Sequence, residues 1–367
     1  MPAPRPLRTA LLGCGRIARG RHLPMLVRSG AFRVLAVVDP DEEGLAAAAR
    51  LAPGAAAHAD PDALYAADPA GPDAVEAVVV ASPSHLHGEH ARAALAAGRH
   101  VYLEKPVGTD LDDARATVRA WEAANADRPA GEALVGRIGF NYRFHPMHRA
   151  ARAAVAAGRL GRLAAARSVY ATPATRLPGW KAARGSGGGA LLDLAIHHVD
   201  NLRFLTGMEV SSVRGRLLSR QSEHDTATLD LLFGEGEDAV PAQVTVAMNA
   251  VDEDRTELIG EAGAVTLDRV ADGVARFRGT GRAGLRRARA RAALAALKPR
   301  RVPGLAPPPE PSTHASLHAF AAAVRGEARG GSRGDAQGTP DLRDGLAALE
   351  VVLAAEADAL RGGPAGA

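Results

Sequence analysis

The sequence predicts two domains in succession: an α/β domain with a doubly wound parallel sheet, then an α+β domain with a largely antiparallel open sheet. The length of 367 residues exceeds what one ordinary hydrophobic core contains and suits two. In the first third of the chain, short β-branched runs alternate with Ala-rich stretches of helical period. After residue 205 several strand-like runs follow one another instead. The chain therefore divides into a region of strand–helix–strand units and a region built on one continuous sheet.

The first domain is predicted over residues 1–127. Its strand runs are almost continuously apolar, which is typical of parallel strands buried on both faces. The predicted strands are Thr9–Leu12, Arg33–Val38, Ala77–Val80 and His100–Leu103. The predicted helices are Arg16–Ser29, Glu42–Leu51, Leu86–Ala97 and Leu111–Ala124.

The second domain is predicted over residues 128–367, after the polar loop Asn125–Gly131. Strands that follow strands without a helix cannot be parallel crossover units, so this sheet should be largely antiparallel. The predicted strands are Ala133–Asn141, Leu163–Thr172, Val210–Leu218, Thr226–Phe233, Ala242–Val251, Thr256–Gly260 and Asp272–Arg278. The predicted helices are Pro146–Ala157, Ala190–Leu205 and Pro340–Leu360. Residues 279–311 form an Arg-rich and then Pro-rich stretch, which predicts a mobile or irregular segment.

Composition argues against several classes of protein. No run approaches roughly 18 consecutive apolar residues, and the start Met1–Pro6 lacks the apolar core of a secretory signal, so no membrane association is expected. The single cysteine, Cys14, excludes an intramolecular disulfide framework and favours the reducing cytoplasm. The net charge of +4 is modest, with its basic excess between Arg276 and Arg301. No pattern of interleaved aromatic residues accompanies it, so a solvated face is favoured over nucleic-acid binding.

A glycine-rich turn follows the first predicted strand and opens the first predicted helix. A phosphate can approach backbone amides closely at a helix N-terminus, where the helix dipole favours negative charge. Gly13 would form the tight turn, Gly15 would admit the pyrophosphate, and Ala18 would keep the helix close to the sheet. The turn, which includes Arg16 and Ile17 as well, predicts the dinucleotide site of a Rossmann domain.

An acidic residue ends the second predicted strand. Asp39 stands 21 residues after Ala18. A carboxylate there can accept both ribose hydroxyls and would repel a 2′-phosphate, which favours NAD over NADP. Arg16 and Arg19 lie close enough in the sequence to leave NADP possible.

Four motifs together resemble the Gfo/Idh/MocA oxidoreductases, the relatives of glucose-fructose oxidoreductase and inositol dehydrogenase. They are Gly13–Ala18, Ser82–His87, Glu104-Lys105-Pro106 and Gly187–Asp200. The resemblance extends from about Leu7 to Leu360. It implies an enzyme that uses NAD or NADP to oxidise a ring hydroxyl, or reduce the ketone, of a sugar, nucleotide sugar or cyclitol.

The resemblance also implies roles for individual residues. Lys105 matches the family's active-site lysine, and Asp193 and His197 match two polar positions on the helix that opens the substrate domain. Asn141 and Arg143 match a strand that enters the site and contacts substrate.

Further positions match the cofactor side of the family's site. Ser82 and Pro83 resemble the Thr-Pro pair beside the nicotinamide ribose, His87 matches a recurring histidine, and Glu104 belongs to the diagnostic tripeptide. The chain departs from the family at Ser84, where asparagine is usual, so a side-chain contact there is not carried over.

The chemistry of these residues suits alcohol oxidation. Asp193, His197 and Asp200 fall at i, i+4 and i+7, which predicts one helical face. His197 would remove the hydroxyl proton, since an unperturbed imidazole titrates near pH ~6.5. The ammonium of Lys105 would stabilise charge on the oxygen and oppose protonation of the imidazole. Asp193 would bind a neighbouring hydroxyl or orient His197.

The sequence thus predicts hydride transfer between a nicotinamide cofactor and a secondary alcohol or ketone of a polyol or sugar. Alternatives are a nucleotide-sugar or trans-dihydrodiol dehydrogenase, or a non-catalytic NAD-binding sensor. No metal site is expected, because the adjacent His197 and His198 point apart. The resemblance implies a homodimer or homotetramer. Loops at Ala171–Gly185 and 279–311 should shape the pocket, with Arg176 and Lys181 as candidates for an anionic substrate.

Overall fold

The computed structural model describes residues 5–68, 71, 73–173, 181, 183–271, 273–279, 311–327 and 338–362. The chain forms two compact units. The first takes the described residues within 1–141, 177–188 and 313–350, and the second takes those within 142–176, 189–312 and 351–367. Almost all of the predicted irregular segment, 279–311, lies outside the described residues, as does Arg176.

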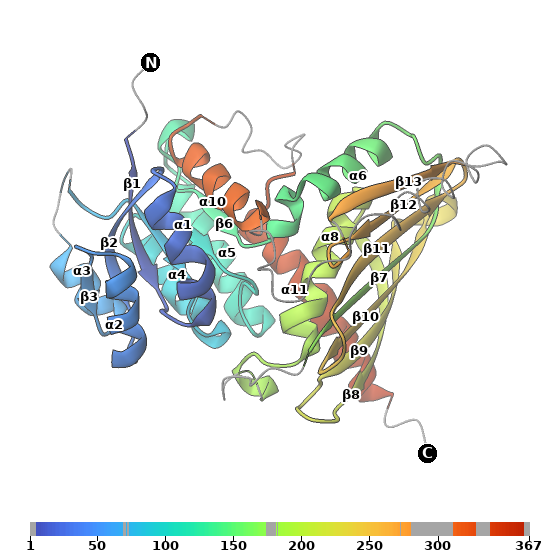
Figure 1. Cartoon of the computed structure of the whole chain (residues 1–367), viewed down its shortest axis with the longest axis horizontal. Coiled ribbons are helices and arrows are strands. Elements are labelled where there is room, and N and C mark those ends of the chain that lie inside the picture. The colour runs from blue at the N-terminus through green and yellow to red at the C-terminus, as the bar shows by residue number, and fades with distance from the viewer. Residues whose placement is uncertain are drawn as a thin grey trace. The chain divides into compact units, whose positions relative to one another are not determined.

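The sheet of the first unit has six parallel strands in the order β3-β2-β1-β4-β5-β6. Figure 1 labels β1, β2, β3 and β6 of this sheet. This is the order of a doubly wound Rossmann sheet, so the predicted fold of the first domain is confirmed. β1 and β4 are buried at every position, as expected for parallel strands covered on both faces. The strands are β1 (Leu7–Leu12), β2 (Phe32–Val38), β3 (Ala56–His58), β4 (Ala77–Val80), β5 (His100–Leu103) and β6 (Gly136–Ile138).

Helices connect these strands, and several begin at a capping aspartate. Asp41, Asp60 and Asp110 each accept a hydrogen bond from the backbone N–H three residues on, at 2.7 to 2.9 Å. The helices are η1 (Ala18–His22), α1 (Leu23–Arg28), α2 (Glu42–Leu51), α3 (Pro61–Ala67), η2 (Ser84–Leu86), α4 (His87–Ala96), α5 (Leu111–Asn125), η3 (Ala130–Glu132), η5 (Arg184–Ser186) and α10 (Pro311–Val324). The division between the units falls within α11 (Leu342–Arg361) and at the start of η4 (Asn141–Phe144).

Some elements of the first unit differ from the sequence prediction. The strand predicted over Ala133–Asn141 exists in part, but as β6 it pairs with β5 in the first sheet rather than lying in the second domain. The short β3 and α3 were not predicted, and the three residues of β3 carry no readable period. α10 was not predicted either.

α10 supplies a part of the first unit's core from far along the chain. Its residues Leu317 and Phe320 are buried in one cluster with Leu11, Leu26 and Tyr102. The Tyr102 hydroxyl hydrogen-bonds Ser316 at 3.0 Å, and the Tyr102 ring meets Phe320 edge to face at 5.7 Å. A buried strand residue therefore has its polar partner more than two hundred positions later in the sequence.

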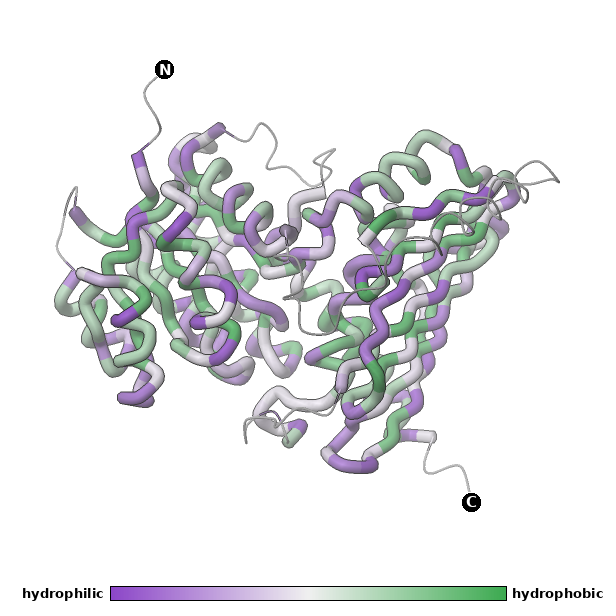
Figure 2. The backbone as a smooth tube through the Cα atoms, in the orientation of Figure 1, coloured by the Kyte–Doolittle hydropathy of each residue, from purple (hydrophilic) through white to green (hydrophobic). Residues whose placement is uncertain are grey.

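The sheet of the second unit has seven strands in the order β13-β12-β11-β7-β10-β9-β8. Only β7 and β10 pair in parallel, so the predicted largely antiparallel sheet is confirmed. Buried and more exposed positions alternate along β10, and hydropathy alternates along the strands in Figure 2. The strands are β7 (Leu163–Thr172), β8 (Val210–Leu218), β9 (Thr226–Phe233), β10 (Val240–Met248), β11 (Glu253–Gly260), β12 (Gly263–Asp268) and β13 (Val274–Gly279), of which β12 was not predicted.

Two of the longer helices lie wholly within the described part of the second unit. α6 (Pro146–Ala156) is capped by His145, and η6 (Leu191–Ala195) continues directly into α8 (Ile196–Thr206). Every residue of α8 except His197 is buried, so this helix contributes heavily to the core. The short η7 (Gly236–Asp238) joins β9 to β10. No helix among the described residues is long and apolar enough to cross a membrane.

Candidate active site

The glycine turn after β1 is closed so tightly that Gly13 has no room for a side chain. Its φ of 91° is a left-handed conformation that other residues rarely adopt. A Cβ atom there would lie 2.4 Å from the backbone nitrogen of Ser82, and the N–H of Gly13 donates to Val38 O at 2.8 Å. Gly13 therefore makes a turn that only glycine permits, between the ends of three neighbouring strands.

Gly15, in contrast to Gly13, has open space around it. A Cβ atom added there would meet nothing within 4 Å. Gly15, Arg16 and Ile17 are exposed, while Ala18 is fully buried and places the helix against the core. The N–H of Arg19 donates to Gly15 O at 3.0 Å, which closes the first helical turn. An open helix start of this kind fits the pyrophosphate of a dinucleotide.

Asp39, at the end of β2, is bound to this turn. Its Oδ2 accepts a hydrogen bond from the backbone N–H of Cys14 at 2.6 Å, and its Oδ1 accepts one from Asp41 N at 2.9 Å. Burial, and next the charge of Asp39, raise the pKa of the Cys14 thiol to about 12. Cys14 is therefore a packing residue, and Asp39 stays the predicted partner of the ribose.

The ends of β4 and β5 are joined through His87. One ring nitrogen lies 2.6 Å from Pro106 O and the other lies 2.9 Å from Ser82 O, and the side chain is buried. Burial lowers the pKa of His87, although its backbone hydrogen bonds oppose that shift. The Oγ of Ser82 hydrogen-bonds His90 at 3.0 Å, and Pro83 is half-buried. His87 thus holds two loops together, while direct contacts of His87, Ser82 and Pro83 with the cofactor stay predictions.

Glu104 links the helix after the glycine turn to the backbone at Lys105. Its Oε1 lies 2.6 Å from Nε2 of His22, which is fully buried in η1, and its Oε2 accepts the backbone N–H of Lys105 at 3.2 Å. Burial opposes ionisation of Glu104, but the hydrogen bond and charge of His22 outweigh it and hold the pKa of the carboxyl below its usual value. His22 was missed by sequence reasoning; its only signal is a polar residue on an otherwise apolar helix face.

Lys105 lies at the carboxyl end of β5, the edge at which doubly wound sheets place their ligands. Its side chain is half-buried, and its peptide bond to Pro106 is cis. With Glu104 on one side and the Pro106 carbonyl held by His87 on the other, the backbone of Lys105 is fixed from both directions.

In the second unit, Asp193 and His197 lie on either side of a change in helix type. Asp193 is in the π-helical η6, and His197 is in the first turn of α8. Both are half-buried, whereas Asp200 is fully buried. A π-turn bonds each residue to the fifth one on, and such turns are frequent at functional sites. His197 and Asp200 lie three residues apart within α8, but Asp200 is the more deeply buried of the two.

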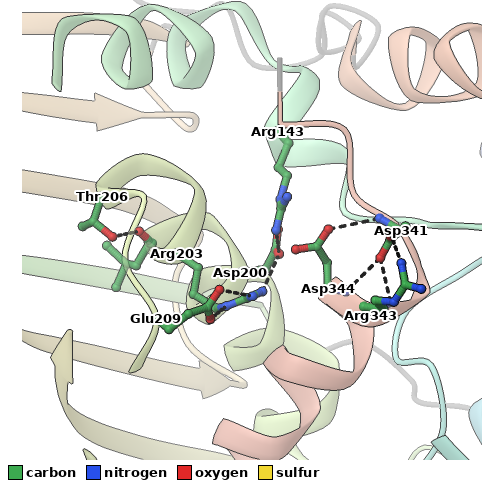
Figure 3. Close-up of polar contacts among 9 residues, drawn as sticks. Arg143, Asp200, Arg203, Thr206, Glu209, Asp341, Arg343 and Asp344 are labelled. Carbon is green, nitrogen blue, oxygen red and sulfur yellow. Dashed lines mark hydrogen bonds and ion pairs between the residues drawn. The ribbon is translucent and has the colours of Figure 1, made fainter. Parts of the chain in front are cut away.

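Arg143 and Asp200 form a buried ion pair (Figure 3). Nε of Arg143 donates to one Asp200 oxygen at 2.9 Å and Nη2 donates to the other, while Arg203 approaches Asp200 at 3.6 Å and binds Glu209 at 2.7 Å. The Arg143 guanidinium also lies 5.7 Å from the centre of the Phe204 ring. These contacts give Arg143 a structural role, and its predicted contact with substrate stays untested.

His197 and His198 have different surroundings. The imidazole of His197 stacks on the ring of Tyr142, with centroids 5.1 Å apart and planes 14° from parallel. His198 is fully buried, hydrogen-bonded to Ser168, and burial lowers its pKa to about 4. His198 is thus a core residue. Like His22, Tyr142 was missed by sequence reasoning, because it stands just after the predicted strand Ala133–Asn141 and no motif marks it.

The backbone before η6 requires glycine at several positions. Gly187 and Gly189 have φ values of 95° and 91°, and a Cβ atom at Gly188 would lie 2.2 Å from Lys181 O. The predicted tight entry to this helix is confirmed. Lys181 and Asn141 are half-buried, and Asn141 N donates to Gly139 O at 2.9 Å. Within the described ranges, no group of three or more His, Cys, Asp or Glu residues could hold a metal ion.

Comparison with protein-family models assigns both regions of the chain. Residues 7–127 match the model of an oxidoreductase family with an NAD-binding Rossmann fold. Residues 148–266 match a GFO/IDH/MocA C-terminal domain.

Individual relatives agree with these matches. The chain is 32% identical to inositol 2-dehydrogenase 2 of Saccharopolyspora erythraea over 73% of its own length and 75% of the relative's. It is 30% identical to dTDP-3,4-didehydro-2,6-dideoxy-alpha-D-glucose 3-reductase of Streptomyces violaceoruber, over 72% and 73% of the two chains. The WlbA dehydrogenase of Bordetella pertussis, solved in complex with NADH and UDP-GlcNAcA, shares the fold, with a TM-score of 0.74, 24% identity and 98% of each chain covered.

Proposed function

Because the chain belongs to the GFO/IDH/MocA family of oxidoreductases with an NAD-binding Rossmann fold, we propose that it transfers a hydride between NAD and a secondary alcohol or ketone of a cyclitol or sugar. The relative that supports a cyclitol substrate is the inositol 2-dehydrogenase, which is 32% identical over three quarters of its length. The enzyme class follows from the family, and the substrate is the part that requires a test.

The first unit has residues that fit the cofactor. The open helix start at Gly15 and Arg16 would hold the pyrophosphate, and Asp39 would accept the ribose hydroxyls. The bound nicotinamide supplies the redox chemistry, accepting or donating the hydride. The carboxylate of Asp39 is already fixed by Cys14 N, so it is oriented before the ribose arrives.

Three side chains would act on the substrate. The ammonium of Lys105 would donate a hydrogen bond to the reacting oxygen and stabilise the negative charge that develops there. The imidazole of His197 would take the hydroxyl proton during oxidation and return it during reduction. Asp193, one turn earlier, would accept a hydrogen bond from a neighbouring hydroxyl or orient the imidazole.

The observation that carries this proposal is the way Lys105 is fixed. Glu104 holds its N–H, and His87 holds the carbonyl of the residue that follows it. A lysine with a purely solvent-facing role needs neither constraint. A lysine whose backbone is fixed at the carboxyl end of β5 suits a group that must meet one oxygen of a bound molecule.

A nucleotide sugar is the second candidate substrate. It is favoured by the likeness to the dTDP-sugar 3-reductase, which is 30% identical over 72% of this chain. The two candidates differ in charge, because a nucleotide sugar brings a pyrophosphate that needs cationic partners and a cyclitol does not.

The test is a spectrophotometric screen of NAD⁺ and NADP⁺ reduction against cyclitols, aldoses and nucleotide sugars, with the reverse reaction for the ketones. We expect NAD⁺ with a cyclitol to give the highest kcat/KM. Lys105→Ala and His197→Ala should each reduce kcat/KM by roughly a hundredfold or more. His314→Gln, on exposed α10 surface, is the matched loss of an imidazole and should leave it unchanged.

Full activity in both active-site variants would refute the assigned chemistry. NAD binding without turnover of any substrate would favour the sensor over the enzyme.

The proposal also covers the role of each domain, the oligomeric state and the cellular compartment. Residues 1–127 would bind NAD and residues 128–367 would bind substrate and support assembly as a homodimer or homotetramer. The broad sheet of the second unit, whose strand β7 has exposed residues such as Arg167 and Val169, is a suitable surface for that assembly. A single buried cysteine suits the cytoplasm. Sedimentation velocity tests the oligomeric state.

A further inference from the structure

The ring of Tyr142 stacks on the imidazole of His197. Tyr142 lies in η4, before the second unit's first long helix, and its side chain is buried. Its ring and the His197 imidazole are 5.1 Å apart and only 14° from parallel. Offset stacking at this distance is a favoured arrangement of two flat rings, and it restricts the tilt of each.

The ring of Tyr142 is itself held in place by its hydroxyl. The hydroxyl donates to Oδ2 of Asp254 at 2.6 Å, and the same oxygen accepts a hydrogen bond from Arg269 Nη1 at 2.7 Å. The Arg269 guanidinium carbon lies 4.0 Å from the centre of the Tyr142 ring, within cation–π range. The backbone N–H of Arg269 donates to Asp254 O at 2.9 Å. Tyr142, Asp254 and Arg269 therefore form a closed set of mutual contacts, which we call the tyrosine support.

Two further imidazoles meet the edges of the same ring. His198 lies 5.6 Å away at 80° and His148 lies 5.3 Å away at 63°. Burial, and next the negative charge of Asp254, raise the pKa of Tyr142 well above its ordinary value, so the hydroxyl stays a donor. With its hydroxyl tethered and its edges packed, the ring has little freedom to rotate.

We propose that Tyr142 is a positioning residue for His197: its ring, anchored by Asp254 and Arg269, fixes the plane of the imidazole that acts on the substrate hydroxyl. The inference rests on the proposed function, in which His197 moves that proton. A base held at the wrong angle loses rate in the chemical step, whereas the substrate still binds. A residue that only fills the core would change stability and leave kcat and KM of the folded enzyme unchanged.

The first arm of the test uses NMR and needs no substrate. The ring protons of His197 are assigned by their loss in His197→Gln, and their shifts are compared among wild type, Tyr142→Phe and Tyr142→Leu. The ring current of Tyr142 should displace these resonances in wild type and in Tyr142→Phe, and Tyr142→Leu should remove the displacement. Unchanged His197 resonances in Tyr142→Leu would overturn the stacking.

The second arm is kinetic, with the best substrate from the screen above. Tyr142→Leu should lower kcat by roughly ten- to a hundredfold while KM changes less than about twofold. The primary deuterium isotope effect on kcat should rise, because hydride transfer becomes more rate-limiting. Tyr142→Phe, which keeps the ring, should recover most of kcat. Unchanged kcat and isotope effect in folded Tyr142→Leu would overturn the positioning role.

Tyr170 provides the matched control. Its ring contacts that of His198, with centroids 5.1 Å apart. Tyr170→Leu removes an aromatic ring from the same unit and should leave the His197 resonances and kcat unchanged. If Tyr142→Leu does not fold, Asp254→Asn releases the same ring and should lower kcat in the same direction; no change there would count against the tyrosine support.

The two arms separate this inference from the proposed function. Loss of the ring-current shift in Tyr142→Leu together with full activity of His197→Gln would mean that the stack exists but His197 is not the base. If the His197 resonances keep their shift in Tyr142→Leu and His197→Gln is inactive, the proposed function stands but Tyr142 has no part in it.

Discussion

Gly13 and Gly15 are two positions apart in one turn, yet glycine serves a different purpose at each. At Gly13 the backbone conformation and the nearby Ser82 nitrogen exclude any side chain. At Gly15 the protein leaves open space, so a side chain there would obstruct only the proposed pyrophosphate site. In this proposal, Gly13 is required for folding and Gly15 for binding.

Substitution by alanine should distinguish the two glycines. Gly15→Ala should keep the thermal stability of the wild-type apoprotein and weaken NAD binding at least tenfold, or about 1.4 kcal/mol. Gly13→Ala should lower the melting temperature itself, because a Cβ atom would overlap backbone. Calorimetric titration with NAD and apoprotein melting provide the measurements. Tight NAD binding by Gly15→Ala would remove that residue from the proposed pyrophosphate site.

His198 should make the second unit sensitive to acid. Burial lowers its pKa from 6.5 to about 4, the charge of Asp254 opposes this and that of Arg269 adds to it. Between these two pH values the unfolded chain binds a proton here that the folded chain does not, so stability is full above pH 6.5 and falls as pH falls through the window. The loss should approach about 3 kcal/mol.

Urea unfolding at a series of pH values tests this expectation. His198→Asn should show a flatter dependence of unfolding free energy on pH over that window than wild type. Parallel curves for the two proteins would assign the acid sensitivity to other groups.

At the scale of elements, the helix formed by η6 and α8 shows what a sequence can and cannot indicate. Its position and polar residues are readable, since Asp193 and His197 follow a glycine-rich entry. The π-turn is not readable, because it depends on packing around the helix rather than on a local residue preference. The sequence also does not show that Asp200, on the same helix, is buried in the core and paired with Arg143.

The Arg143–Asp200 pair should behave as a buried ion pair. Asp200→Leu alone would leave a buried guanidinium without its carboxylate and should lower the unfolding free energy of the second unit by about 3 to 5 kcal/mol. The double variant Arg143→Met/Asp200→Leu should recover much of that loss, because it removes both charges.

Urea unfolding of the full chain gives these values. The exposed pair Arg162–Glu261 is the control, and its disruption should change stability by less than about 1 kcal/mol. Additive losses in the Arg143 and Asp200 variants would show that the two side chains are not coupled.

At the scale of the whole molecule, the sequence predicted the helices and strands better than it predicted which of them pack together. The four strands predicted for the first domain, and the antiparallel character of the second sheet, agree with the structure. β6 was placed in the wrong sheet and α10 was missed, since an apolar stretch does not reveal which distant surface will cover it. The candidate site shows the same difference. Lys105 and His197 lie in recognisable sequence motifs, whereas His22 and Tyr142 were identified only from their contacts in the structure.

The contribution of α10 can be measured. Phe320→Ala should lower the unfolding free energy of the first unit by about 3 to 5 kcal/mol, because it empties part of a shared core. Saturating NAD should restore part of the melting temperature by stabilising the folded state. A stability equal to that of wild type would show that α10 is not required for this core.

The place of α10 in the chain sets the order in which the protein can be completed during translation. When the ribosome has finished residues 1–141, the hydroxyl of Tyr102 still lacks Ser316, and Leu317 and Phe320 have not been made. The nascent nucleotide-binding unit therefore keeps an apolar surface uncovered until α10 has been synthesised, when nearly the entire polypeptide has emerged. Ribosome-stalled chains ending before α10 should therefore be digested readily by protease, and chains that extend past it should resist.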